Sequence, residues 1–171
     1  MGTSRRYLVF CVVLFAALCT APVSAPSLSR DEAIQGAIQH SAEQLPKMQG
    51  AVVRIAVESG NVVLLGTVRL YIQKMEYERI AWTTEGVKEV ESEIRVVPNV
   101  PVLDSAIEKH IRAIVNTNAR FRTAELTLLV AGGSVLLDAT FDHPDDVLFL
   151  KHRVAEIEGV TAIVIKSTFR V

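Results

Sequence analysis

The chain repeats one glycine-centred pattern after 73 residues, and this repeat restricts what it can fold into. The first copy spans residues 58–68 and is followed by Glu85-Gly86-Val87. Gly133 follows Gly60 by 73 positions (133 − 60), and Gly159 follows Gly86 by the same distance (159 − 86). Glycine at these places is typical of a tight turn between two strands and of a helix end that leads into a strand. We therefore expect a small α/β unit that occurs twice.

The length and composition of the chain suit two small folded domains. Its 171 residues are 50% hydrophobic and only 22% charged, which is unlike the composition of disordered proteins. The formal net charge of −1 gives no general attraction to the phosphates of nucleic acid. Nucleic acid is therefore not an expected partner.

Residues 1–25 differ from the rest and have the pattern of an export signal. Two arginines, at positions 5 and 6, precede an apolar run from Tyr7 to Leu18, and this order is typical of a signal peptide. The run is shorter than the roughly 20 apolar residues that span a bilayer. Two ways of processing remain open: cleavage after Ala25, or acylation of Cys19. Leu18 departs from the small residue that lipoprotein signals have before the cysteine, and Pro26 would hinder cleavage after Ala25.

Both cysteines of the chain, Cys11 and Cys19, lie in this segment. The remaining residues offer no thiol, so no disulfide, thiol nucleophile or cysteine-bound metal is expected in the exported protein.

The sequence after the export signal predicts a helix, two strands, a helix and a strand. Ser29 and Glu32 have the spacing of a capping box before a helix over about 31–44. Alternating aliphatic residues predict strands over 53–57 and 62–69, joined by a turn at Gly60-Asn61. A second helix over 71–85 stops at Gly86, and a third strand follows. Within the second helix, one stripe is expected to contain Ile72, Met75, Arg79 and Trp82.

The same order returns from Asp104 to Val171, with a hairpin turn at Gly132-Gly133-Ser134. The predicted fold class is α+β: two tandem α-β-β-α-β units, each a three-stranded mixed sheet with two helices on one face. The two domains are expected at residues 29–98 and 104–171. A short proline-containing linker, residues 98–103, joins them.

The glycines and aliphatic residues of the first unit resemble the BON domain family, a small envelope module of bacteria. The residues that carry the resemblance are Gly60, Val62, Leu64, Gly66 and Val68, then Ile80-Ala81, then Gly86-Val87. The second unit departs from the pattern at Ala139, where the family has glycine, and at Arg153-Val154, where it has Ile-Ala.

The resemblance implies a non-catalytic, periplasmic double-BON protein. Such proteins are similar to osmotically inducible stress proteins and to outer-membrane double-BON lipoproteins, and are linked to envelope integrity. Some of them bind anionic phospholipid. These glycines and aliphatic residues build the module, so they specify the fold and not a ligand.

A three-stranded sheet covered by helices on one face leaves its other face open. By alternation this outward face carries Val63 and Leu65 in the first unit, and Leu129, Leu136 and Val164 in the second. Exposed aliphatic residues of this kind often mark an interaction surface. The alternatives are ordinary surface aliphatic residues, or docking between the two domains in which the sheets cover each other.

A basic cluster in the second unit is the candidate lipid-binding site. Its residues lie on the first helix of that unit and the loop after it: Lys109, Arg112, Arg120, Phe121 and Arg122, with His110 beside them. An aromatic ring between cations could enter a bilayer interface while the cations meet lipid phosphates. The alternative is a solvated helix face with Phe121 in the core, in the place of Met48.

No metal, cofactor or catalytic group is expected. The segment Asp142-His143-Pro144-Asp145-Asp146 contains metal-ligating residue types, but a helix start explains each of them. Glu89, Glu91 and Glu93 share one strand face, which suits solubility.

The function expected from the sequence is binding at the periplasmic membrane surface, with anionic phospholipid or an envelope protein as partner. This role would support envelope integrity or the osmotic stress response. The alternative is a soluble periplasmic protein that contacts other proteins, or protects against stress, without binding lipid.

Overall fold

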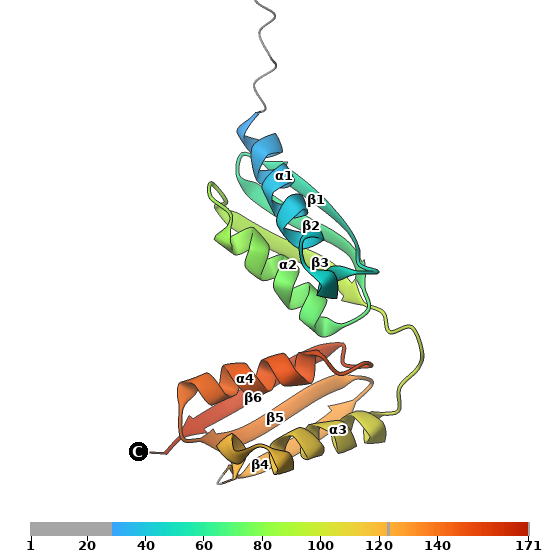
Figure 1. The fold of residues 1–171 in the computed structure, drawn as a ribbon, viewed down its shortest axis with the longest axis vertical. Helices are drawn as coiled ribbons and strands as arrows, with labels where there is room; N and C mark the ends of the chain where they lie inside the picture. The colour runs from blue at the N-terminus through green and yellow to red at the C-terminus, as the bar shows by residue number, and fades with distance from the viewer. Residues whose placement is uncertain (1–28, 123, 171) are drawn as a thin grey trace, which may run out of the picture.

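A computed structural model describes residues 29–122 and 124–170 of the chain. The export signal, including Cys19 and the cleavage position after Ala25, lies outside these residues. Figure 1 shows two units, one above the other, each with the order α-β-β-α-β. The elements of the first unit are α1 (Arg30–Glu43), η1 (Pro46–Met48), β1 (Val52–Glu58), β2 (Asn61–Val68), α2 (Tyr71–Thr83) and β3 (Glu89–Val96). Those of the second are α3 (Asp104–Thr117), η2 (Ala119–Phe121), β4 (Leu126–Ala131), β5 (Ser134–Phe141), α4 (Pro144–Ala155) and β6 (Ala162–Phe169).

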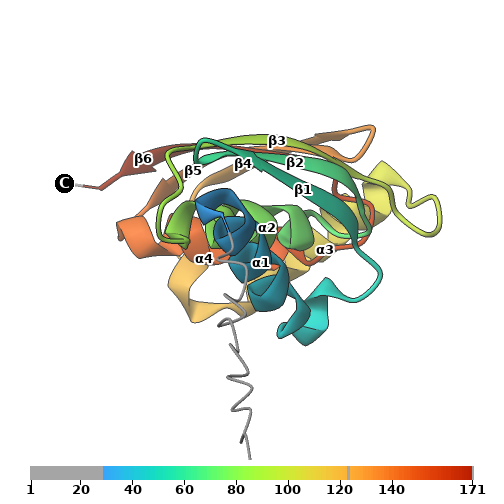
Figure 2. The ribbon, with the colours of Figure 1, turned by 90° about the horizontal axis from the view of Figure 1, so that it is seen from above.

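Each unit contains one mixed three-stranded sheet. β1 pairs antiparallel with β2, and β2 pairs parallel with β3 across the crossover helix α2. β4, β5 and β6 repeat this arrangement, with the hairpin strand β5 at the centre. Figure 2 shows the strands of both sheets along one side of the molecule and the helices α1 to α4 along the other. The predicted fold class is confirmed.

The predicted capping box opens α1. The Ser29 hydroxyl accepts a hydrogen bond from the Glu32 N–H at 3.2 Å, and the Glu32 carboxylate accepts one from the Ser29 N–H at 2.8 Å. Two N–H groups that the helix itself cannot satisfy are thereby paired. One side of α1 then buries Ile34, Ile38 and Ala42 against the sheet.

The first hairpin turn lies one residue earlier than the sequence indicated. Glu58 pairs with Asn61, so the two-residue loop is Ser59-Gly60 and not Gly60-Asn61. Both loop residues have positive φ, 54° at Ser59 and 85° at Gly60. Two positive φ angles are what a tight hairpin requires, because they match the twist of the strands. The prediction was wrong because asparagine tolerates positive φ better than serine.

Asp31 explains why serine is accepted there. Its carboxylate accepts hydrogen bonds from the Ser59 N–H at 2.8 Å and the Gly60 N–H at 3.0 Å. The second unit has the same contact, since the Asp104 carboxylate accepts from the two N–H groups of its hairpin loop at 2.8 Å and 2.9 Å. That loop is Gly132-Gly133. We call these two contacts the aspartate–turn clamps.

The repeated glycines bring the hairpin turn against the end of the second helix. A Cβ atom on Gly60 would lie 2.9 Å from the Gly86 carbonyl oxygen, and one on Gly133 would lie 2.3 Å from that of Gly159. The Gly60 carbonyl accepts the Lys88 N–H at 2.9 Å, just before β3 begins. The glycine pattern therefore fixes the fold and forms no ligand site.

Gly66 marks a close approach that the second unit lacks. Its φ is 153°, and a Cβ atom there would lie 2.1 Å from the Val52 carbonyl oxygen. Ala139 stands in its place in the second unit and is buried in the core. β4 begins at Leu126, which corresponds to Val53, so the first residue of β1 has no counterpart in β4. The departure from the family pattern is therefore local.

Each unit has its own hydrophobic core, and α2 contributes to both. Tyr77, Ile80 and Ala81 are buried in the first core, whereas Ile72 is 4% exposed and belongs to the second. Met75 also packs against the second core, beside α4. The two units therefore meet through helices.

This arrangement corrects two expectations. The open sheet faces lie on the same side of the molecule, so the sheets do not cover each other (Figure 2). Trp82, expected on one stripe with Ile72 and Met75, is 57% exposed. Only the first turns of α2, with Ile72 and Met75, face the second unit. The exposure of Trp82 could not be predicted because the sequence does not show where the second unit lies.

The aspartate–turn clamps predict a matched pair of destabilised variants. Asp31→Ala and Asp104→Ala should each lower the free energy of unfolding by about 2 kcal/mol, because each removes two hydrogen bonds to a charged acceptor. Urea denaturation of the full chain measures this. Glu125→Gln, at an exposed carboxylate outside the clamps, should change stability by less than about 0.5 kcal/mol. A loss in the aspartate variants no larger than in this control would contradict the role of the clamps.

Candidate functional site

The predicted lipid-binding cluster is divided by the structure into buried and exposed parts. Phe121 is 3% exposed, with its ring centroid 6.2 Å from that of Phe141 and 6.1 Å from that of Phe149. It therefore lies in the core, in the place that Met48 has in the first unit, as the alternative expectation had it. Its ring is not available to a bilayer in this fold.

The arginines of the cluster differ in their contacts. Arg120 forms an ion pair at 3.0 Å with Asp146, whose side chain is 6% exposed, and its guanidinium lies 5.1 Å from the centre of the Phe149 ring. Arg112 pairs with Glu108 at 2.7 Å on the exposed side of α3. Lys109 and Arg122 are exposed and form no ion pair within the described part of the chain.

The first unit holds a corresponding polar contact beneath η1. The Glu76 carboxylate, 6% exposed, pairs with Lys47 at 2.6 Å and Arg79 at 2.8 Å. Burial alone would raise the pKa of the Glu76 carboxyl, but the hydrogen bonds and charges of the two cations outweigh it and hold this pKa below the ordinary glutamate value. Gln73, fully buried, donates to the carbonyl oxygens of Lys47 and Gln49 at 2.8 Å and 3.1 Å.

In both units a polar contact joins the 3-10 helix to the helix after the hairpin, but the residues that form it differ. Lys47 corresponds to Arg120 and Gln73 to Asp146, both 73 residues later, and in each unit they tie the 3-10 helix to the helix that follows the hairpin. Arg120 therefore has a structural role, which the sequence did not reveal because its partner lies 26 residues away.

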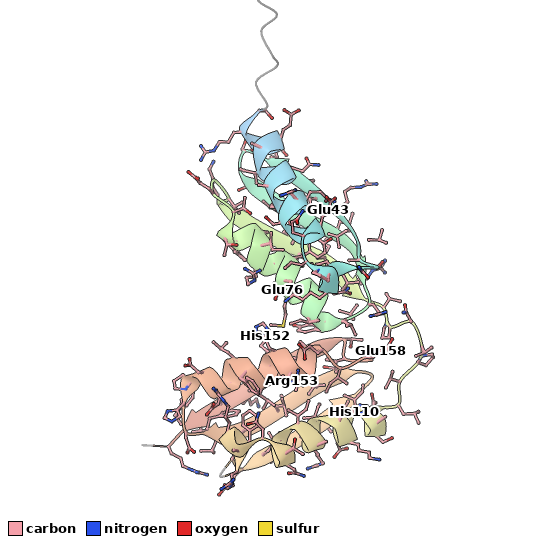
Figure 3. The ribbon with its side chains drawn as sticks, in the orientation of Figure 1. Glu43, Glu76, His110, His152, Arg153 and Glu158 are labelled. Atoms are coloured by element: carbon pink, nitrogen blue, oxygen red, sulfur yellow. The ribbon has the colours of Figure 1, made fainter. Side chains whose placement is uncertain are left out.

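A groove opens between the helices of the second unit. α1 packs against α2, whereas α3 and α4 make few direct contacts. The groove has a volume of about 460 Å³, and His110 and Arg153 line its two sides (Figure 3). His110 stands where the first unit has Ala37.

The open face of the first sheet is charged, with Arg54 and Arg95 on it as well as glutamates. β3 presents Glu89, Glu91 and Glu93 to solvent on this face. Val63, next to Glu91, is half-buried, and Leu65, next to Glu93, is 46% exposed. The aliphatic residues expected on this face are therefore present, but each has a carboxylate beside it.

The open face of the second sheet is apolar at its centre. Leu129 pairs with Leu136, and Leu136 pairs with Val164, so the three side chains form one row across the sheet. Leu129 is 60% exposed and Val164 52% exposed. We call these three residues the apolar row. In the first unit the same row reads Ala56, Val63, Glu91.

The sequence identified the members of the apolar row, but their alignment across three strands depends on the strand register. It missed the exposure of Trp82 on α2 and of Leu148, 61% exposed, on α4. Both are apolar residues at helical positions that sequence patterns assign to a core.

The residues 29–122 and 124–170 were expected to form no metal site. They contain no group of three or more histidine, cysteine, aspartate or glutamate side chains that could hold an ion. Pro144 begins α4, with Asp145 and Asp146 in its first turn, as expected for a helix start. None of the helices described here has the length and apolar character needed to cross a bilayer.

Comparison with known proteins identifies the first unit. Residues 30–98 match the family described as BON domain, so a BON domain is found there. A curated protein of Anaplasma centrale, described as an uncharacterized protein in the gshII 5' region, is 33% identical over 90 residues. That match covers 50% of this chain and 60% of the relative, so the chain spans less than two thirds of the relative's length.

Two solved structures show a distant likeness. Both are of CdsD, a structural protein of the type III secretion system of Chlamydia trachomatis, one of them described as its C-terminal domain. Each is 18% identical and covers 78% of this chain, with TM-scores of 0.33 and 0.32. The chain spans 63% and 59% of these two structures.

Proposed function

We propose that this chain, with a BON domain at residues 30–98, is an exported, non-catalytic envelope protein that binds other proteins through the open sheet face of its second unit. BON domains are often periplasmic envelope modules, and the family is in general non-catalytic. The second unit, residues 104–170, is proposed as a further BON-like copy on the same order of strands and helices.

The observation that carries this proposal is the apolar row. Leu129, Leu136 and Val164 lie side by side on a face that none of the described helices covers. Exposed apolar side chains gathered in one place are typical of protein interaction sites, because their burial removes apolar surface from water. Charged side chains interrupt the matching face of the first unit, where Glu91 stands in the place of Val164, and this favours the second unit as the binding surface.

A photo-activated cross-linking residue at position 129 should form adducts with a partner protein in the cells that export the chain. The same residue at position 56, the equivalent place in the first sheet, should form few, because the charged side chains of Arg54 and Glu58 beside it keep this part of the face in water. Gel mobility and mass spectrometry of the adducts measure this. Equal yields at the two positions, or none at position 129, would contradict the proposal.

A second candidate function is contact with anionic phospholipid. The exposed cations Lys109, Arg112 and Arg122 on α3 and beside η2 support it. The apolar side of α3, with Ile107 and Ile111, is buried in the core. Lipid contact at this surface would therefore be electrostatic, without insertion of the helix.

Under this second function, the full chain should float with anionic vesicles at low salt and lose that binding as salt rises. Lys109→Ala with Arg122→Ala should weaken vesicle binding by about thirtyfold, since each cation near an anionic surface contributes about 1 kcal/mol. Arg120 is left unchanged because it pairs with Asp146. Flotation that the double variant does not alter would exclude this surface from lipid binding.

A further inference from the structure

We infer that β4 is a docking edge for a second copy of this chain, paired antiparallel about a two-fold axis. This inference rests on the proposed function, because pairing at β4 would join the open faces of two second units into one larger binding surface. β4 is an outer strand of its sheet, and among the described residues no strand pairs with its free side. A free edge presents N–H and C=O groups that another strand can pair with.

The hydrogen bonds of the sheet show which groups of β4 are free. The Thr140 N–H donates to the Glu125 carbonyl oxygen at 3.1 Å. Because bonded and non-bonded pairs alternate in an antiparallel ladder, Thr127 and Leu129 also bond to β5. The backbone groups of the alternate residues point to the free edge: Leu126, Leu128 and Val130.

β4 is the one outer strand among the described residues that carries no charge. Its sequence is LTLLVA, whereas β1 includes Arg54 and Glu58. β3 has three glutamates and an arginine, and β6 has Lys166. Charged side chains on an edge strand oppose pairing with another chain. Three edges therefore have this protection and β4 does not.

A second copy is the occupant that fits this edge. With Leu128 on the two-fold axis, Leu126 of each copy would pair with Val130 of the other, so all three free residues would bond. Thr127 would lie opposite Leu129 of the second copy, with no like charges facing each other. The two apolar rows would lie on the same face of one six-stranded sheet. Each copy would thereby extend the apolar surface of the other.

The size of the contact sets the expected affinity. Pairing over one strand of six residues buries less than the roughly 1,200 Å² that stable interfaces usually reach. We therefore expect a dimer that forms with rising concentration and dissociates on dilution.

Sedimentation velocity of the full chain over roughly 1 μM to 1 mM tests this, since a weak dimer dissociates in this range. The variant Thr127→Lys with Leu129→Lys places lysines opposite each other across the axis and should raise the dissociation constant by about tenfold or more. The control is Ala56→Lys, which gives β1 an equivalent pair of cations with Arg54 and should leave the dissociation constant unchanged. Residues 1–28 are the same in all three proteins, so their contribution cancels.

Amide hydrogen exchange on the unaltered chain locates the contact without a substitution. The amides of Leu126, Leu128 and Val130 should exchange more slowly at high concentration, while those of Val53, Ile55 and Val57 on the free edge of β1 should not change. A monomer at all concentrations, or a dimer that keeps these three amides fast or survives the double lysine substitution, overturns the inference. If position 129 nevertheless cross-links to a protein of another mass, the proposed function stands and only self-association fails. If position 129 forms no adduct at all, the proposed function fails as well.

Discussion

Both units depend on one contact, in which an aspartate in the first turn of a helix holds the hairpin that follows it. Asp31 and Asp104 each accept two backbone hydrogen bonds from their turns, which fixes the first helix across the start of the sheet. Gly60 and Gly133 then allow the turn to meet the end of the second helix. The third strand can begin only beside that turn, parallel to the second. The covered and open faces of each sheet follow from this order.

The two units keep these internal contacts and differ on their surfaces. The apolar row of the second sheet corresponds to Ala56, Val63 and Glu91 on the charged open face of the first. Ala37 lines a hollow of about 370 Å³ between α1 and the end of α2, whereas His110 lines a groove of about 460 Å³ between α3 and α4. α2 serves two cores, so the units are held together through helices, and both open faces remain on one side (Figure 2). For this reason we propose the open face of the second sheet, and not a surface formed by both sheets, as the protein-binding site.

Much of the fold could be predicted because it depends on patterns of residues that are close together in the sequence. The repeat, the capping box at Ser29 and the alternating strands depend on residues close in sequence. The hairpin loop was misplaced by one residue because serine seldom takes positive φ, and the Asp31 carboxylate that accepts the Ser59 N–H lies 28 residues away in the sequence. The candidate lipid site depended on side chains whose partners are also distant. Phe121 meets Phe141 in the core, and Arg120 meets Asp146, so neither could be assigned to a surface role from sequence alone.

The central claim is that the apolar row is covered by protein where the chain works. Thiol labelling in the intact envelope tests it most directly, with cysteine placed at Val164 or at Glu91, the equivalent position in the first sheet. Labelling is read from the peptide that contains each position. We predict that Val164→Cys reacts slowly in the envelope and quickly in dilute purified protein, whereas Glu91→Cys reacts quickly in both. Equal and rapid labelling of the two positions in the envelope would contradict the account.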